Sequence, residues 1–172
     1  MAKVLVIGSG GRCHAIIAGL KKSPLVDEIY CAPGNAGISE IAKLVDIKET
    51  DVTNLVKFAK EAQIDLTVVG PEAALSVGVV DEFRASGLKI FGPTKAAAQI
   101  ESSKEFAKKL MLKYNIPTAK YEAFDNYDEA ASYVKSHGAP IVLKYDGLAA
   151  GKGVIVAMSE NEALDGLKEM LV

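Results

Sequence analysis

The sequence lacks the features that mark several large classes of protein. Its 172 residues include only two cysteines, too few for a disulfide framework, so a cytoplasmic location is expected. No apolar run approaches the roughly 20 residues of a membrane-spanning helix, and the N-terminal apolar stretch is too short for a secretory signal. The net charge of −2 lacks the basic excess of nucleic-acid-binding proteins. We therefore expect neither a membrane nor a nucleic-acid partner, and no Ser-His-Asp set or zinc-ligand cluster is visible.

Residues 1–100 alternate strand-like apolar runs with amphipathic helical patterns. Val4-Leu5-Val6-Ile7 is a continuous run, typical of a strand buried on both faces of a parallel sheet. Strands are predicted at 4–7, 28–31, 66–69 and 88–91, and helices at 51–62 and 75–85, among others. Strands separated by helices predict a doubly wound parallel sheet in an α/β fold.

The pattern changes between residues 95 and 120, where we place a domain boundary. Residues 95–114 have a helical pattern, in one segment or two. The elements expected after them are strand 121–124, helix 128–136, strand 141–144, strand 154–157 and helix 160–171. Two strands joined directly by a glycine-rich loop indicate an antiparallel hairpin, so this part has an α+β architecture.

The segment Gly8-Ser9-Gly10-Gly11-Arg12 lies where the first strand becomes a helix. Such a turn presents free backbone N–H groups and the positive end of a helix, and Arg12 adds a donor suited to phosphate. The alternative is a tight turn that binds nothing. A dinucleotide fingerprint is disfavoured, because Cys13 stands where a third glycine is needed and no acidic residue ends the second strand.

Other glycine-containing loops follow the predicted strands. In a doubly wound sheet the loops 33–37, 70–72 and 92–94 would share one edge with the first turn, which favours a small-molecule site there, although each loop alone could be a simple turn. The loop 146–153 does not fit the P-loop pattern, because Asp146 replaces its first glycine. A hairpin loop of this kind either covers nucleotide phosphates or is merely flexible.

Five segments together resemble one family of enzymes. They are VLVIGSGGRCHA (4–15), APGNAGI (32–38), VVGPEAAL (68–75), GLKIFGPTKAAAQIESSKEFAK (87–108) and DGLAAGKGV (146–154). In this order and spacing they are similar to the phosphoribosylamine–glycine ligases, ATP-grasp enzymes of purine biosynthesis. The resemblance covers about the first two-fifths of a typical member. It implies a Rossmann-like substrate-binding domain at 1–100, a linking helix of the ATP-grasp fold at 101–120 and an incomplete α+β ATP-grasp lobe at 121–172.

The resemblance also implies two sets of binding residues. Phosphoribosylamine would lie along the first sheet edge, near Gly8, Gly10, Gly11, Arg12, Asn35, Gly37 and Glu72. The ATP phosphates would be met by Lys104, Lys144, Gly151, Lys152 and Gly153. The family reaction forms an acyl phosphate from glycine and ATP, which the amine of phosphoribosylamine then attacks. No residue of this chain is assigned a catalytic role.

The family's Mg²⁺ ligands are expected downstream of residue 172. We therefore predict that this chain alone has no ligase activity and that the missing C-terminal part of the enzyme is a possible partner. A non-catalytic module that binds a phosphate ligand or another protein is the alternative. Three positions depart from the family pattern, since glutamate is usual at Cys13, alanine at Tyr145 and proline at Ala74. Cys13 and Cys31 are expected near each other, as two unlinked thiols rather than a disulfide.

Overall fold

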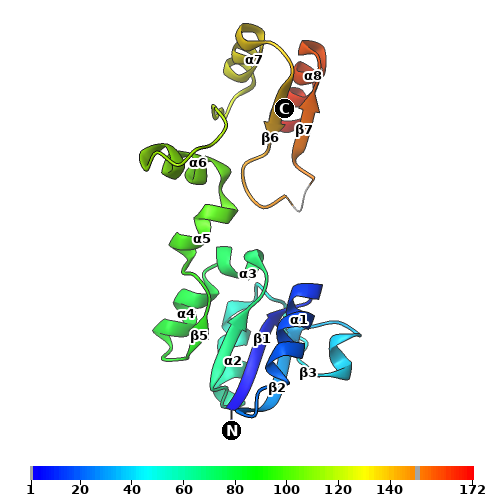
Figure 1. Cartoon of the computed structure of the whole chain (residues 1–172), viewed down its shortest axis with the longest axis vertical. Coiled ribbons are helices and arrows are strands. Elements are labelled where there is room, and N and C mark those ends of the chain that lie inside the picture. The colour runs from blue at the N-terminus through cyan, green and yellow to red at the C-terminus, as the bar shows by residue number, and fades with distance from the viewer. Residues whose placement is uncertain (1, 150–151) are drawn as a thin grey trace. The chain divides into compact units, whose positions relative to one another are not determined.

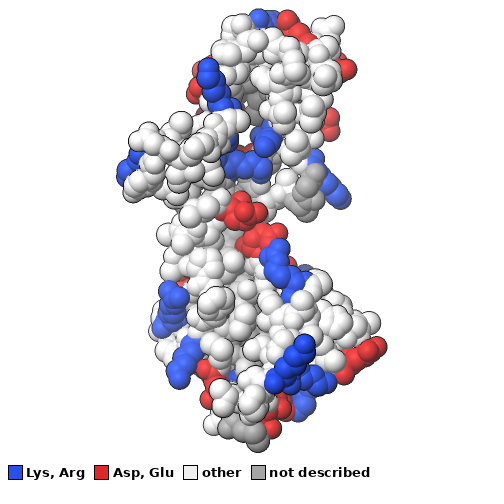
Figure 2. All heavy atoms as spheres, viewed as in Figure 1, with Lys and Arg blue, Asp and Glu red and all other residues white. Residues whose placement is uncertain are grey.

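The computed structural model describes residues 2–149 and 152–172 (Figure 1). The chain divides into two compact units, residues 1–99 and 100–172. Within the described residues, no helix combines the length and apolar character needed to span a membrane. Basic and acidic side chains are interspersed on the face of the molecule seen in Figure 2.

The first unit is a parallel α/β sheet with helices on both faces. Its elements are β1 (Ala2–Gly8), α1 (Gly11–Leu20), β2 (Val26–Pro33), the 3₁₀ turn η1 (Ile38–Glu40), β3 (Lys43–Leu44), α2 (Val52–Glu61), β4 (Leu66–Val69), α3 (Glu72–Ser76), α4 (Val79–Ala85) and β5 (Ile90–Phe91). The strand order is β3-β2-β1-β4-β5, and every neighbouring pair is parallel. The predicted doubly wound sheet is therefore confirmed.

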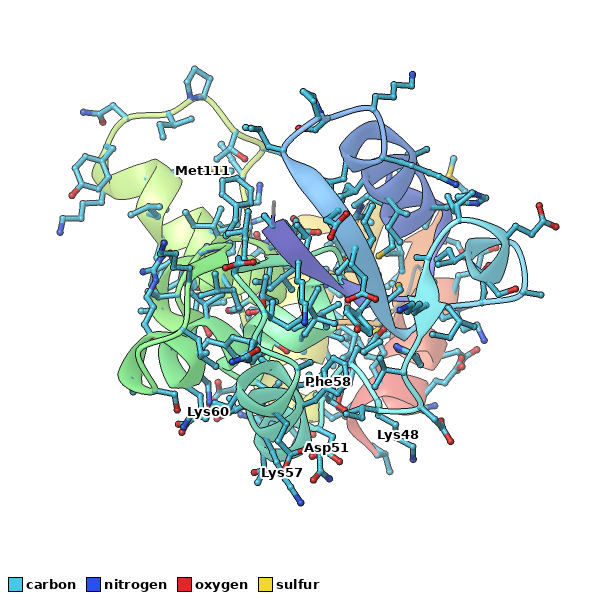
Figure 3. The ribbon with its side chains drawn as sticks, turned by 90° about the horizontal axis from the view of Figure 1, so that it is seen from below. Lys48, Asp51, Lys57, Phe58, Lys60 and Met111 are labelled. Carbon is cyan, nitrogen blue, oxygen red and sulfur yellow. The ribbon has the colours of Figure 1, made fainter. Side chains whose placement is uncertain are left out.

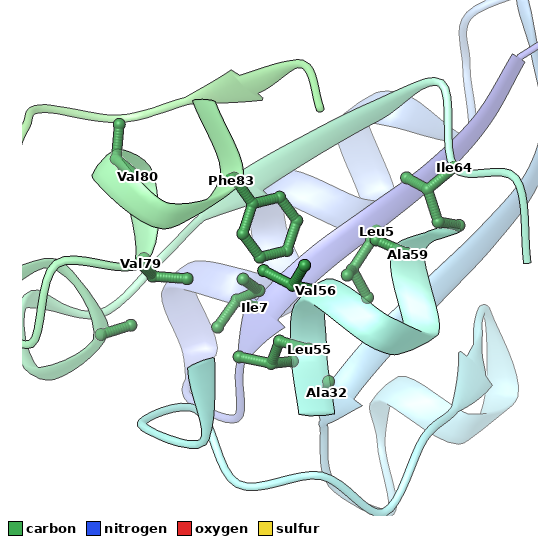
Figure 4. Packing of buried hydrophobic residues seen from close by; sticks show 11 residues of the cluster. Leu5, Ile7, Ala32, Leu55, Val56, Ala59, Ile64, Val79, Val80 and Phe83 are labelled. Carbon is green, nitrogen blue, oxygen red and sulfur yellow. The ribbon is translucent and has the colours of Figure 1, made fainter. Parts of the chain in front are cut away.

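Strand β1 lies at the centre of the sheet and divides the core between its two faces. Leu5 and Ile7 pack with α2 and α4, where Phe83 is fully buried (Figure 4). Val4 and Val6 pack on the opposite face with α1. This alternation follows from the period of two along a strand, and it explains why the apolar run of β1 is continuous.

Helix α2 shows how the local sequence places its ends. Asp51 precedes it, and the Asp51 carboxylate accepts a hydrogen bond from the Asn54 backbone N–H at 3.2 Å. Leu55, Val56 and Ala59 are its buried residues. Figure 3 labels Asp51 together with Lys57 and Lys60 on this helix, and both lysines are exposed.

Two predictions for the first unit were wrong in detail. The single helix expected at 75–85 is divided into α3 and α4, because Gly78 adopts a left-handed conformation with φ +88°. The strand expected at 88–91 is shortened to β5, which pairs with β4 through two residues. Sequence patterns also missed β3 and η1, which have only two and three residues.

Replacing Thr67 with valine is expected to raise the free energy of unfolding by about 1 kcal/mol. Thr67 in β4 is 1% exposed, and its Oγ1 has no hydrogen-bond partner among the described residues. Valine keeps the branched shape and removes the unsatisfied hydroxyl. Urea unfolding followed by circular dichroism measures the change. Thr53→Val at an exposed site of α2 is the control and should change stability little; a loss of stability in Thr67→Val would contradict the prediction.

The second unit begins with two helices and continues with a covered hairpin. Its elements are α5 (Lys95–Ser102), which crosses the unit boundary, α6 (Lys104–Lys113), α7 (Tyr127–His137), β6 (Ile141–Lys144), β7 (Val154–Ala157) and α8 (Glu160–Leu171). Strands β6 and β7 pair antiparallel, which confirms the predicted hairpin. Its core joins residues of α7, β6, β7 and α8, and contains no residue of α5 or α6.

The strand expected at 121–124 is absent from the structure, and this prediction was wrong. The described sheet of this unit consists of β6 and β7, and residues 121–124 pair with neither strand. Phe124 instead packs on Tyr133 of α7, with ring centroids 5.2 Å apart. The helical stretch 95–114 forms two helices, because Ser103 is extended and its hydroxyl accepts the Phe106 N–H at 3.1 Å as the N-cap of α6.

Candidate functional site

The turn after β1 is closed tightly by glycine. Gly8 has φ +129°, and a Cβ there would lie 2.5 Å from Cys13 Sγ and 2.7 Å from Pro71 Cδ. No other residue fits this combination of backbone angle and close approach. Gly8 therefore brings the start of α1 and the loop after β4 against the end of β1.

Gly10 and Gly11 leave the beginning of α1 open. Gly10 is the N-cap, and as a glycine it supplies no side-chain cap to the first turn of the helix. A Cβ on either glycine would meet no atom within 4 Å, and both residues are exposed. The N–H groups of a first helical turn attract anions, so a turn of this kind can accept a phosphate.

Arg12 is anchored across the same sheet edge. Its Nη1 donates to the Gly70 carbonyl at 2.7 Å and to Glu72 Oε2 at 3.3 Å. The backbone N–H of Glu72 lowers the pKa of the Glu72 carboxyl most. Burial opposes it, and the Arg12 guanidinium adds to the lowering, so the pKa stays below its usual value. Glu72 is therefore a carboxylate anion that orients the Arg12 guanidinium. The remaining N–H groups of the guanidinium are then available to a ligand.

Asn35 connects the loop after β2 to the glycine turn. Its Nδ2 donates to the Ser9 carbonyl at 2.5 Å, and its Oδ1 accepts the Ile38 N–H at 3.0 Å. A Cβ on Gly37 would lie 3.4 Å from Asn35 Oδ1 and 3.5 Å from the His14 ring. The residues predicted for the first site, from Gly8 to Glu72, therefore gather at one edge of the sheet.

Two thiols lie beneath this edge. Cys13 and Cys31 are both buried, and both are free thiols. Cys31 Sγ donates to the Gly8 carbonyl at 3.2 Å, and Cys13 Sγ lies 3.6 Å from the Ile7 carbonyl. Burial raises the pKa of Cys31 to about 12 and also raises the pKa of Cys13. Cys13 is thus a neutral packing group below the turn.

A second cluster of functional candidates lies in the other unit, around Lys104. Lys104 Nζ donates to the Gly147 carbonyl at 2.8 Å. The Asp146 carboxylate accepts the backbone N–H of Lys104 at 2.5 Å and that of Glu105 at 3.3 Å, and Ser103 Oγ lies 3.1 Å from it. Burial raises the pKa of Asp146, but these hydrogen bonds outweigh it and keep the pKa below its usual value. The loop after β6 is thereby attached to the start of α6.

The remaining predicted nucleotide residues follow β6. Lys144 is exposed at the end of the strand, paired with Val154, and Lys152 is exposed in the loop. Gly153 accepts the Tyr145 N–H at 2.8 Å, and a Cβ on Gly153 would lie 2.9 Å from the Cβ atoms of Tyr145 and Ala149. The loop is therefore closed by glycine, with the Tyr145 ring exposed beside it. Gly151 lies outside the described residues.

Sequence reasoning did not assign Ser103, Asp146 or His14 to a site. Asp146 and Ser103 are 43 positions apart, and no spacing rule connects them. His14 lies beside Gly37 at the sheet edge. Among residues 2–149 and 152–172, no group of three or more His, Cys, Asp or Glu side chains is placed to hold a metal ion.

Two family models match the chain, and they meet close to the boundary between its two compact units. Residues 2–101 match the family model "Phosphoribosylglycinamide synthetase, N domain", and residues 102–172 match "Phosphoribosylglycinamide synthetase, ATP-grasp (A) domain". The chain is 58% identical over 170 residues to the phosphoribosylamine–glycine ligase of Neisseria meningitidis serogroup A, covering 99% of this chain and 40% of the relative. It is 55% identical over 168 residues to that of Halalkalibacterium halodurans, covering 98% of this chain and 39% of the relative.

Solved structures give the same relationship. The crystal structure of phosphoribosylamine–glycine ligase from Thermotoga maritima superposes with a TM-score of 0.74 at 32% identity, covering 95% of this chain and 38% of that one. An ADP complex of N5-carboxyaminoimidazole ribonucleotide synthetase has a TM-score of 0.78 at 17% identity, covering 97% and 44%, and shows the shared fold. The chain spans about two-fifths of the length of these relatives. From its N domain through the start of its ATP-grasp domain, the chain belongs to the phosphoribosylglycinamide synthetase family.

Proposed function

We propose that this chain provides the substrate-binding unit and the first part of the ATP-grasp unit of a ligase in purine biosynthesis. That ligase joins glycine to 5-phosphoribosylamine and releases ADP and phosphate, in the cytoplasm. The observation that carries the proposal is the match of both units, in order, to the two domain models of one family. The relatives at 55–58% identity carry the corresponding name.

The first unit is proposed to bind the sugar phosphate. The open first turn of α1 at Gly10 and Gly11 offers backbone N–H donors, and Arg12 adds a guanidinium held in place by Gly70 and Glu72. Asn35 holds the neighbouring loop against Ser9. These groups are preorganised in the protein, so binding a phosphate requires little rearrangement.

The second unit is proposed to contact the ATP phosphates. Lys104, Lys144 and Lys152 offer cationic donors suited to a triphosphate that carries about four negative charges. The backbone of the glycine-rich segment after β6 would add N–H donors. In the family reaction, these groups would orient the nucleotide and offset its charge while the acyl phosphate forms.

Magnesium has no proposed ligand among the described residues. Their carboxylates do not form a metal site, so this chain's residues do not fit the ion by themselves. We therefore propose that the 172-residue chain has no ligase activity alone and that the remaining part of the enzyme supplies the metal site. Steady-state release of ADP that depends on glycine and phosphoribosylamine would contradict this.

Binding calorimetry on the chain tests the proposal directly. We expect ribose 5-phosphate and ATP to bind and NAD not to bind. Arg12→Ala should weaken the affinity for ribose 5-phosphate about 10-fold, because it removes a charge-assisted donor. Arg84→Ala is the matched control, since Arg84 is also exposed and donates to a glycine carbonyl, that of Gly92.

The outcomes separate the competing functions. Binding of NAD without ribose 5-phosphate would replace the proposal with a dinucleotide-binding function. If the chain bound none of the three ligands, the result would favour the alternative of an interaction module. The buried thiol at Cys13, where the family usually has glutamate, is the observation behind that alternative.

A further inference from the structure

Among the described residues, four hydrogen bonds connect the segment after β6 to the start of helix α6. Asp146 accepts the backbone N–H groups of Lys104 and Glu105 and contacts the Ser103 hydroxyl. In the opposite direction, Lys104 Nζ donates to the Gly147 carbonyl. Two segments 42–43 residues apart are thus joined by reciprocal hydrogen bonds.

Apolar packing does not explain this contact. Helix α6 has no buried residue, and Phe106 and Leu112 on it are 37% and 60% exposed. The core of the second unit includes residues of α7, β6, β7 and α8 but none of α6. Since α6 contributes no buried residue to this core, we attribute the position of the described loop residues relative to Lys104 mainly to the hydrogen bonds around Asp146.

Ordinary helix capping does not explain it either. Ser103 already acts as the N-cap of α6, because its hydroxyl accepts the Phe106 N–H at 3.1 Å. Asp146 takes the N–H groups that Ser103 leaves free. Asp146 is the first residue of the glycine-rich loop. Its carboxylate therefore connects the loop to the helix that carries Lys104.

We propose that Asp146 is a positioning residue: it fixes residues 145–149, which follow β6, to the first turn of α6, so that Lys104 and this segment approach the ATP phosphates as one preorganised unit. This inference rests on the proposed ATP binding of the second unit. Asp146 does not touch the nucleotide, because one of its carboxylate oxygens accepts from Ser103 and the other from the first N–H groups of α6. Its removal would leave Lys104 and the loop to be ordered by the nucleotide itself, which weakens binding.

Amide exchange measured by NMR on the 172-residue chain tests the connection without any ligand. In Asp146→Ala we expect exchange at least 10-fold faster at Lys104 and Glu105 and also across the contact at Tyr145, whose N–H is bonded to Gly153. Leu167, in the core of the unit, should be unchanged and shows that the unit remains folded. Faster exchange confined to Lys104 and Glu105 would overturn the proposal, since Asp146 would then be only a helix cap.

Calorimetry with ATP tests the consequence for binding. Asp146→Ala should weaken ATP at least 10-fold, and Asp146→Asn should fall between Ala and the native residue, because the amide oxygen still accepts the α6 N–H groups but lacks the charge. Asp125→Ala is the control, at an exposed aspartate of the same unit whose carboxylate accepts only from the adjacent Asn126 within the described structure.

The two measurements distinguish the failure of this inference from the failure of the proposed function. Equal ATP affinity in the native chain and Asp146→Ala overturns the positioning role and leaves ATP binding intact. No ATP binding by the native chain overturns the proposed function and the nucleotide role of Asp146, while the amide exchange still decides whether Asp146 connects the loop to α6.

Discussion

Replacing Gly70 with alanine is expected to destabilise the first unit by about 3 kcal/mol, at the upper end of the usual penalty for overpacking. A Cβ on Gly70 would lie 2.3 Å from Cys13 Sγ and 3.2 Å from the Ile7 carbonyl oxygen. Neither neighbour moves easily, because Cys13 is buried and Ile7 belongs to the central strand. Gly70 itself is held by hydrogen bonds to Ile7 and Arg12.

A second substitution shows whether Cys13 is the cause. Cys13→Ala removes the sulfur atom that the new methyl group would meet, and alone it should lower stability by about 1 kcal/mol through the small cavity. In the double variant most of the Gly70→Ala penalty should disappear, giving a coupling of about 2 kcal/mol. Urea unfolding provides the free energies, and amide exchange in β1 and β4 assigns them to the first unit. An equal penalty with and without Cys13 would show that the contact is not the cause.

Gly19→Ala is the matched control for the glycine substitution. Gly19 lies in α1 and is exposed, and a Cβ there meets no atom within 4 Å. The same change should therefore stabilise the chain by roughly 0.5–1 kcal/mol through helix propensity. The opposite signs expected at the two glycines distinguish close packing from backbone flexibility.

The parts of the fold that were predictable depend on local patterns. The apolar run of β1 identifies a strand buried on both faces, and Asp51 marks the beginning of α2 within one residue. The division at Gly78 was not predicted, because the apolar pattern continues through 75–85 and a single glycine within such a pattern does not by itself specify a left-handed turn. Strand β3 is held by pairing with β2 rather than by its own two residues.

The candidate site was predictable where a loop's position follows from the sheet. Loops after parallel strands meet at one edge, so Gly10, Arg12, Asn35 and Glu72 were expected together without any knowledge of their contacts. The connection between Asp146 and α6 follows no such rule. It joins a hairpin loop to a distant helix through side-chain and backbone hydrogen bonds, and nothing in the local sequence of either segment requires it.

Substitution of Gly10 by aspartate is expected to separate phosphate binding from stability. Gly10 is the N-cap of α1 with extended backbone angles of φ −85° and ψ 176°, and its side-chain position is open. Aspartate is a favoured N-cap residue and glycine only slightly less so, so the free energy of unfolding should stay the same or rise by a few tenths of a kcal/mol. The same carboxylate would occupy the first helical turn and repel a phosphate. The affinity for ribose 5-phosphate, measured by calorimetry, should therefore fall about 100-fold.

Gly10→Asn isolates the charge in this comparison. Asparagine has nearly the same shape and caps a helix equally well, but it is neutral. It should therefore weaken ribose 5-phosphate much less than aspartate does, and the difference should shrink as the salt concentration rises, because the repulsion occurs at an exposed site. Equal losses with Asp and Asn would mean that the side chain only blocks the turn. Unchanged affinity in Gly10→Asp would place the phosphate away from α1, since a carboxylate and a phosphate cannot share the N–H groups of one helical turn.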